Sequence, residues 1–437
     1  MGPNGTPSTF YHPQRAPCHG ARCFETTPIA QPMPAIHTRT LGNGLTILVE
    51  PMPALRSASV SILSPAGIIR QPAGKQGAAN LLAEMVARGA GGLSSRAHSD
   101  ALDRLGVQRG VSCASRHLHV SARLLGSNLQ AALPLLLSQV ASPLLEEAAL
   151  EPSRELCLQE FEALADDPQQ RAMIALRQKH YASPFNRHPL GDKETLCSLT
   201  LGDVRAFWQS CAVPGGSILA VAGDADPDAV CQWAQAATAK WSGAIAPQAL
   251  GLVPPRGLHH EEADATQCHI ALACEAAIET APDAILWKAA IGVLSGGMSG
   301  RLFTELREKR GLCYSVYASY AGAAEFGSVL VYAGTTAPRA KETHQVLVGE
   351  LARLRDGITP DEFARAKVGM KAGLVMQGES SGARAASIAN DQVVYGRPRT
   401  LEEKAAQVDA LTFEQVDSFV RRTELKPATT VVIGPKN

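Results

Sequence analysis

The chain has 437 residues, more than one ordinary hydrophobic core holds, and its length predicts two domains of about 200 residues each. Lys plus Arg and Asp plus Glu both number 41, without long runs of one sign, which excludes the charge pattern of a nucleic-acid-binding protein. No uninterrupted apolar stretch reaches the roughly 18 residues of a membrane-spanning helix, so we expect no membrane span.

The first segment, residues 1–35, is rich in Pro, Gly and Thr and shows neither a strand nor a helix period. It also lacks the apolar core of a signal peptide. We therefore predict a flexible N-terminal arm.

The following segment, residues 36–243, opens with two strand-like runs, Leu45–Glu50 and Ser57–Leu63, before helical stretches take over. Near its end, Thr200 and Asp203 have the spacing of a capped helix start. An apolar, β-branched run then ends at Gly223 and is typical of a buried strand.

The remaining segment repeats this order after a proline-rich stretch, residues 244–258, which we predict to be a linker. A strand is predicted over His269–Cys274, a capped helix start at Thr412 with Gln415, and a buried strand that ends at Gly434.

Two further pairs of segments match at nearly constant separation. GGLSSR at 91–96 resembles GGMSGR at 296–301, and LTLGDVRAF at 199–207 resembles LTFEQVDSF at 411–419. Such self-similarity indicates an internal duplication. We therefore predict an α+β fold of two homologous sandwich lobes, residues 36–243 and 259–437, each a mostly antiparallel sheet covered by helices.

The segment GGMSGRLFTELREKRGLCYSVYA, residues 296–318, closely resembles the second-half signature of the pitrilysin (insulinase) type of zinc metallopeptidase. Within that family it is most similar to the subfamily of mitochondrial processing peptidase and its bacterial relatives. The resemblance extends to LGNGLTILVEP at 41–51 and FNRHPLGDKETLCSLT at 185–200.

Peptide-cutting members of this family carry His-x-x-Glu-His on a first-half helix and a further Glu later. Two imidazoles one turn apart and a carboxylate bind zinc, and the Glu between the imidazoles activates the metal-bound water. Here Asn80 and Glu84 stand where the two His would be, and Ala83 replaces the base. Glu160 matches the third ligand, while Ser153 replaces another Glu of active members. The resemblance implies a degenerate metal site and no metal in this chain.

Two alternatives remain for these positions. Asn80, Glu84 and Glu160 could hold calcium or magnesium loosely through one amide and two carboxylates. In the other interpretation, which we prefer, they complete a helix face and bind no metal.

A second pair of family positions is retained. The family places an Arg and a Tyr seven positions apart, which Arg307 and Tyr314 match. The resemblance implies that both point into a zinc site, where they bind the peptide and stabilise the oxyanion of its hydrolysis. From periodicity alone, Arg307 would be a helix-surface charge beside Glu305 and Glu308, and Tyr314 a strand aromatic.

These observations predict a zinc-free subunit of a heterodimeric metallopeptidase, inactive alone. The resemblance implies a homologous zinc-binding partner subunit that holds the cofactor, and partly unfolded peptides as substrates. The alternatives are a non-catalytic structural subunit, like the core proteins of the respiratory cytochrome complex, and an autonomous enzyme with an altered metal site. The resemblance favours a periplasmic location, with the cytoplasm as the alternative.

Overall fold

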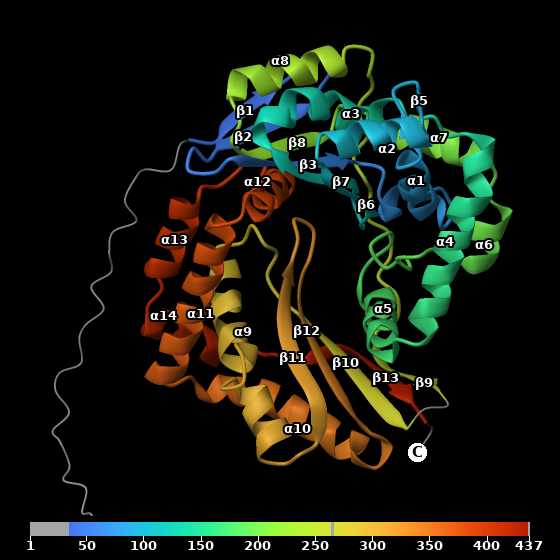
Figure 1. The fold of residues 1–437 in the computed structure, drawn as a ribbon. Coiled ribbons are helices and arrows are strands. Elements are labelled where there is room, and N and C mark those ends of the chain that lie inside the picture. The colour runs from blue at the N-terminus through green and yellow to red at the C-terminus, as the bar shows by residue number, and fades with distance from the viewer. Residues whose placement is uncertain (1–34, 264–265, 436–437) are drawn as a thin grey trace, which may run out of the picture. The chain divides into compact units, whose positions relative to one another are not determined.

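The computed structural model describes residues 35–263 and 266–435, in which helices cover two separate sheets (Figure 1). The predicted N-terminal arm, residues 1–35, lies outside the described residues except for Ala35. Among the described residues, no helix combines the length and the apolar character that crossing a bilayer requires.

The first sheet has the strand order β1-β2-β8-β3-β7-β6, and a short hairpin, β4 and β5, lies apart from it. The strands are β1 (His37–Thr40), β2 (Thr46–Pro51), β3 (Ser57–Ser64), β4 (Gly89–Ala90), β5 (Leu93–Ser94), β6 (Gln108–Cys113), β7 (Leu118–Leu125) and β8 (Ile218–Gly223). The helices of this half are α1 (Ala78–Val86), α2 (Ser95–Arg104), α3 (Leu129–Ala141), α4 (Glu147–Ala165), α5 (Pro168–His180), α6 (Lys193–Ser198), α7 (Leu201–Cys211) and α8 (Pro227–Ala237).

The second sheet has the strand order β11-β12-β10-β13-β9. Its strands are β9 (Gly257–Glu262), β10 (Gln267–Glu275), β11 (Cys313–Gly322), β12 (Gly327–Thr336) and β13 (Pro427–Gly434). The helices of this half are α9 (Ala284–Ser295), a π-helical turn η3 (Phe303–Glu308), α10 (Ala340–Arg353), α11 (Pro360–Gly378), α12 (Ser381–Tyr395), α13 (Leu401–Asp409) and α14 (Phe413–Arg422).

The two sheets share one topology. In each sheet the first and last strands of a repeated five-strand unit pair in parallel, β2 with β8 and β9 with β13. The other neighbours pair antiparallel in matching order, β8-β3-β7-β6 and β13-β10-β12-β11. Strand β1 is an additional edge strand of the first sheet. The predicted α+β class with two duplicated, mostly antiparallel lobes is confirmed.

The local predictions for the repeated unit also hold. Thr200 caps α7 and Thr412 caps α14, and in both cases a side-chain oxygen of the third helical residue accepts a hydrogen bond from the cap backbone N–H. The buried strands β8 and β13 end at Gly223 and Gly434 as expected. The end of the predicted linker, residues 244–258, overlaps a strand in the structure. Strand β9 begins at Gly257 and pairs with β13.

Each half supplies one helix to the sheet of the other half. The described residues belong to one compact unit, in which α12 packs against β3 and β8 and α5 packs against β10 and β13 (Figure 1). Ile388 and Ala389 of α12 join an apolar cluster with first-sheet residues, and Ala172 and Leu176 of α5 join one with second-sheet residues. The exchange buries a second face of each sheet, so the stability of each half depends on the presence of the other half.

A buried ion pair fixes the α12 side of this exchange. Arg384 of α12 and Glu50 of β2 are 0% and 1% exposed. The Arg384 Nε and Nη2 atoms each donate to the Glu50 carboxylate, at 2.9 Å. On the α5 side, the His180 ring is hydrogen-bonded to Thr429 and to Ser328, at 3.1 Å each. These contacts set the position of each exchanged helix as well as its burial.

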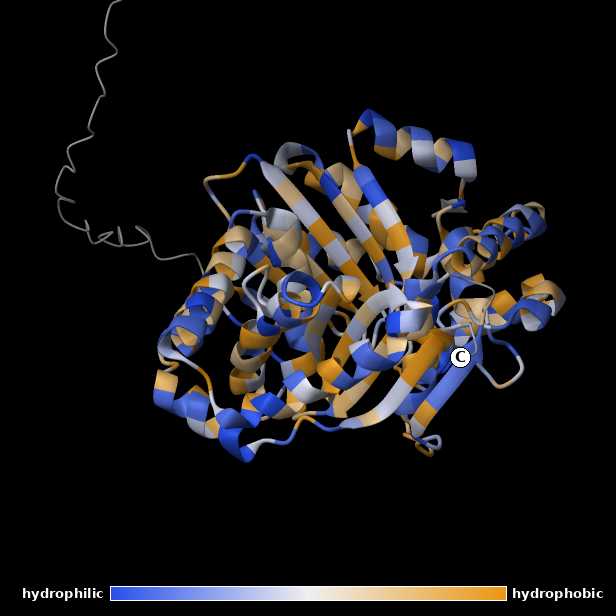
Figure 2. Cartoon of the chain, turned by 90° about the horizontal axis from the view of Figure 1, so that it is seen from below, coloured by the Kyte–Doolittle hydropathy of each residue, from blue (hydrophilic) through white to orange (hydrophobic). Residues whose placement is uncertain are grey.

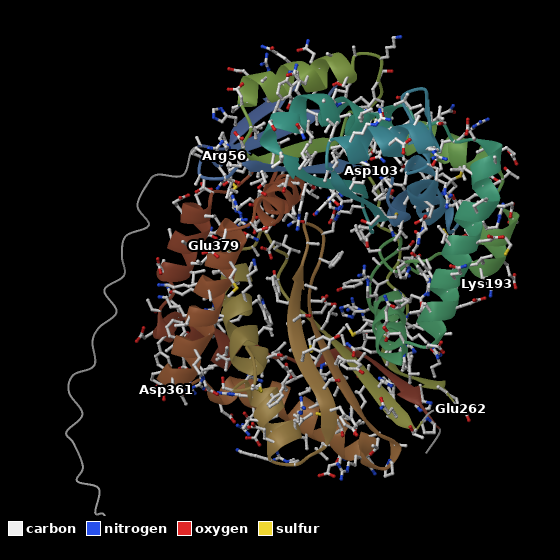
Figure 3. All side chains as sticks on the ribbon, in the orientation of Figure 1. Arg56, Asp103, Lys193, Glu262, Asp361 and Glu379 are labelled. Atoms are coloured by element: carbon white, nitrogen blue, oxygen red, sulfur yellow. The ribbon has the colours of Figure 1, made fainter. Side chains whose placement is uncertain are left out.

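The outer surface carries charges of both signs. Figure 2 shows hydrophilic and hydrophobic residues interspersed along both the helices and the strands. Exposed residues of opposite charge come from both halves in Figure 3, among them Arg56, Lys193, Asp361 and Glu379. This distribution agrees with the balanced composition of the chain.

Replacement of Glu50 tests the exchanged helix. Glu50→Gln leaves the Arg384 guanidinium buried without its counter-charge, which costs about 3–5 kcal/mol. Arg397→Gln, which breaks an exposed ion pair with Glu403, should cost below about 1 kcal/mol. Urea unfolding of both variants measures the difference, and equal losses would show that the buried pair does not hold α12.

Candidate functional site

Arg307 lies on the π-helical turn η3 that leads into β11. The guanidinium carbon stands 4.9 Å from the centre of the Phe303 ring, a cation–π contact that orients the side chain. The turn closes through a hydrogen bond from Lys309 N to Thr304 O at 3.0 Å. Insertions of this type are frequent at functional sites, because they rotate side chains away from regular helical positions.

The carboxylates near Arg307 in sequence are directed elsewhere. Glu305 accepts hydrogen bonds from Lys309 and Arg310, at 2.7 Å each, and these lower its pKa to about 2. In the described part of the chain, no carboxylate is within ion-pair distance of Arg307. Arg307 is exposed, so its charge is available to a ligand.

Tyr314 sits on a β-bulge at the start of β11. The pairing of β11 with β12 shifts register between Cys313 and Ser315, so Tyr314 is the extra residue in the strand. Its side chain is 71% exposed. Bulges commonly redirect a side chain beside an active site, and this one turns Tyr314 out of the ladder.

Tyr314 borders a cavity of about 290 Å³ that sequence reasoning did not find. One wall is the start of α5 from the first half, Asp167 to Gln169, and the other is the second sheet, with His269 and Tyr332. The sequence predicts only a strand at His269 and gives no signal at Tyr332. Their proximity depends on the pairing of β10 with β12, which no local sequence signal gives.

The four first-half positions at which the sequence predicts a degenerate metal motif lie on α1 and α4, which pack together. Burial and the Glu84 carboxylate raise the pKa of Glu160. Burial, with Glu84 and Glu160 adding to it, raises the pKa of Cys157 to about 12. The structure therefore brings Glu84 and Glu160 near each other, together with a thiol that stays protonated.

These donors do not fit zinc. Asn80 Oδ1 is buried without a hydrogen-bond partner, and Ala83 presents only a buried methyl group. One amide and two carboxylates lack the imidazole and thiolate ligands that tetrahedral zinc sites use. Within residues 35–263 and 266–435, no group of three or more His, Cys, Asp or Glu side chains could hold a metal ion.

Comparison with known proteins gives the family. Residues 46–193 match the sequence model "Insulinase (Peptidase family M16)", and residues 198–370 match "Peptidase M16 inactive domain". The chain belongs to the insulinase (M16) peptidase family. The family predicted from the 296–318 segment is thus confirmed.

Several relatives of this M16 chain match over most of their length. An uncharacterized zinc protease of Streptomyces coelicolor is 28% identical over 416 residues, which cover 92% of this chain and 90% of the relative. An uncharacterized zinc protease of Mycobacterium tuberculosis is 29% identical over 425 residues, with 93% and 95% covered.

Solved structures support the fold. A protease from Helicobacter pylori matches with a TM-score of 0.85 at 22% identity, covering 92% of this chain and 100% of that chain. A peptidase M16 inactive domain from Pseudomonas fluorescens matches at 0.82 and 24%, covering 92% and 98%. A chain of Complex III2 from Candida albicans matches at 0.77 and 18%, covering 92% and 96%.

The raised pKa of Glu160 gives a pH-dependent stability prediction. Because folding raises this pKa above the ordinary value of about 4.3, ionised Glu160 opposes folding at neutral pH and neutral Glu160 does not. Glu160→Gln should therefore increase the urea midpoint at pH 7, and the gain should vanish by about pH 4. Glu162→Gln on the same helix is the control. A gain that persists unchanged at low pH would contradict the electrostatic origin.

Proposed function

We propose that this chain is the zinc-free subunit of a two-subunit M16 peptidase and contributes Arg307 and Tyr314 to the active site of a homologous zinc-binding subunit. The observation that carries the proposal is the presentation of this pair. An exposed guanidinium without a carboxylate partner in the described chain precedes a tyrosine that a bulge turns out of its strand.

The pair has the chemistry that peptide hydrolysis requires. Attack on a peptide carbonyl develops negative charge on its oxygen, and donors fixed at that position lower the barrier. The Arg307 N–H groups and the Tyr314 hydroxyl donate to this oxygen and to the adjacent peptide backbone. Arg307 additionally supplies a full positive charge, and its contact with Phe303 restrains it before substrate arrives.

The first-half site supports the assignment of zinc to the partner. Asn80, Ala83, Glu84 and Glu160 lack both a zinc-binding donor set and a general base, so hydrolysis needs a second chain. The relatives named zinc proteases and the match to the M16 inactive domain agree with a role for this chain in a peptidase.

Substrate binding in this proposal uses an open sheet edge. Strands β6 and β11 are terminal strands, each paired on one side among the described residues. An extended peptide can add to such an edge through backbone hydrogen bonds, which gives affinity with little demand on sequence. Because β11 also carries Tyr314, a peptide along this edge would pass close to the proposed oxyanion donor.

A reconstitution assay tests the proposal. This chain, a family member from the same organism that retains His-x-x-Glu-His, and their mixture are compared on a quenched fluorescent peptide. Cleavage should require the mixture, and Arg307→Ala or Tyr314→Phe should lower kcat by about 100-fold, the usual cost of an oxyanion donor.

Two matched variants serve as controls. Arg355→Ala removes another exposed arginine of the same half, and Tyr320→Phe removes a hydroxyl farther along β11. Both should leave kcat within about twofold of the wild-type mixture, since neither touches the reacting groups. An unchanged kcat of the mixture with Arg307→Ala and with Tyr314→Phe would support the structural-subunit alternative. Cleavage by this chain alone would contradict the zinc-free assignment.

A further inference from the structure

We propose that the cavity between the first sheet and the start of α12 binds a carboxylate of the peptide substrate. The inference rests on the proposed function and specifies a substrate group at a site that Arg307 and Tyr314 do not line. The cavity has a volume of about 420 Å³ and is lined by β3, β6, β7 and α12. Helix α12 packs against β3 (Figure 1), and β6 is the terminal strand to which an extended peptide can add.

The charge of this cavity is positive. Of the described residues that line it, Arg109 and Arg123 carry a full charge at neutral pH. Arg109 is paired with the exposed Asp103, at 2.6 Å. The exposed Arg123 guanidinium makes no hydrogen bond or ion pair within the described part of the chain. The cavity therefore holds one uncompensated positive charge, which suits a monoanion such as a carboxylate better than a dianion.

The Arg123 guanidinium lies against the first turn of α12, which is the positive end of the helix. A Cβ on Gly382 would stand 2.8 Å from Arg123 Nε and 2.9 Å from Nη2, so only a glycine leaves room for the guanidinium in this position. This turn contains no acidic residue, and its first N–H groups, from Ser381 and Gly382, have no intrahelical acceptor. Two positive groups placed together repel each other, and an anion bound between them removes the repulsion.

A buried hydroxyl and an imidazole supply a further donor. Ser61 is 3% exposed, and its Oγ is hydrogen-bonded to His119 Nε2 at 2.9 Å. Burial lowers the pKa of His119, so its ring is neutral at pH 7. If the Ser61 hydroxyl donates within this pair, His119 Nδ1–H stays free, and if Nε2–H donates, the Ser61 O–H stays free. In both cases the pair retains one donor for a ligand.

The start of α12 is fixed in place before a ligand arrives. The hydroxyl oxygens of Ser59 on β3 and Ser381 on α12 are hydrogen-bonded at 2.9 Å. Arg384, further along the same helix, is held by the buried pair with Glu50. The first turn of α12 therefore keeps its position at the cavity, which lowers the entropic cost of binding.

Peptide binding to the isolated full chain, measured by fluorescence anisotropy, tests this site. The reference peptide has one glutamate and a free C-terminus, and two further labelled peptides carry either a C-terminal amide or glutamine in place of the glutamate. One of these two should bind the wild-type chain about fivefold more weakly than the reference, the size expected for an ion pair with an exposed arginine. The peptide that loses affinity shows whether the site takes the chain end or an acidic side chain.

Two substitutions should abolish the difference between the peptides. Arg123→Gln removes the unpaired charge, and Gly382→Ala places a methyl group where the guanidinium lies. The ratio of affinities within each variant is compared, so a general loss of binding does not imitate the effect. Arg104→Gln, which removes an exposed arginine of α2 that does not line the cavity, should leave the ratio unchanged.

Three results would overturn the proposed site. They are equal affinity of the wild-type chain for the three peptides, no measurable binding of any of them, and a preference that survives either cavity substitution. Loss of the preference in Arg104→Gln would indicate a general field and would also reject the site. Because the assay contains no zinc-binding subunit, its outcome does not depend on cleavage by the mixture, and the two proposals can fail separately.

Discussion

The buried pair between Arg384 and Glu50 is the constraint on which the arrangement of the two halves depends. It ties α12 of the second half to β2 of the first sheet, where neither charge meets water. The reciprocal helix, α5, is tied to the second sheet through His180. Because Asp167 caps the start of α5 and lines the cavity beside Tyr314, the exchange of helices builds one wall of that cavity.

The two halves share a topology and differ in the chemistry that each retains. In the first half, the positions where the resemblance places a metal motif hold an amide, a methyl group and two carboxylates, and burial with Glu84 and Glu160 raises the pKa of the Cys157 thiol. In the second half, a π-helical turn and a β-bulge present Arg307 and Tyr314 to solvent. The proposed two-subunit peptidase assigns Arg307 and Tyr314 as donors to a reacting carbonyl and takes its metal site from a homologous chain.

Local signals predicted much of this fold. The caps at Thr200 and Thr412 and the strands ending at Gly223 and Gly434 depend on neighbouring residues, so the sequence reveals them. The exchange of α5 and α12 could not be predicted, because the apolar face of a helix does not specify which sheet it covers. The contact of His269 with Tyr332 follows from strand register, and the exposure of Tyr314 from a bulge, both set by tertiary pairing.

Photocrosslinking from position 314 shows whether this position reaches the substrate in the assembled pair. A benzophenone amino acid replaces Tyr314, and the chain is mixed with a zinc-binding homologue and a labelled peptide substrate. The same replacement at Met376, an exposed residue of α11, is the control. We predict that position 314 crosslinks to the peptide in the assembled pair and that position 376 does not. Efficient cleavage by a pair assembled with wild-type chain, together with no peptide crosslink from position 314, would contradict it.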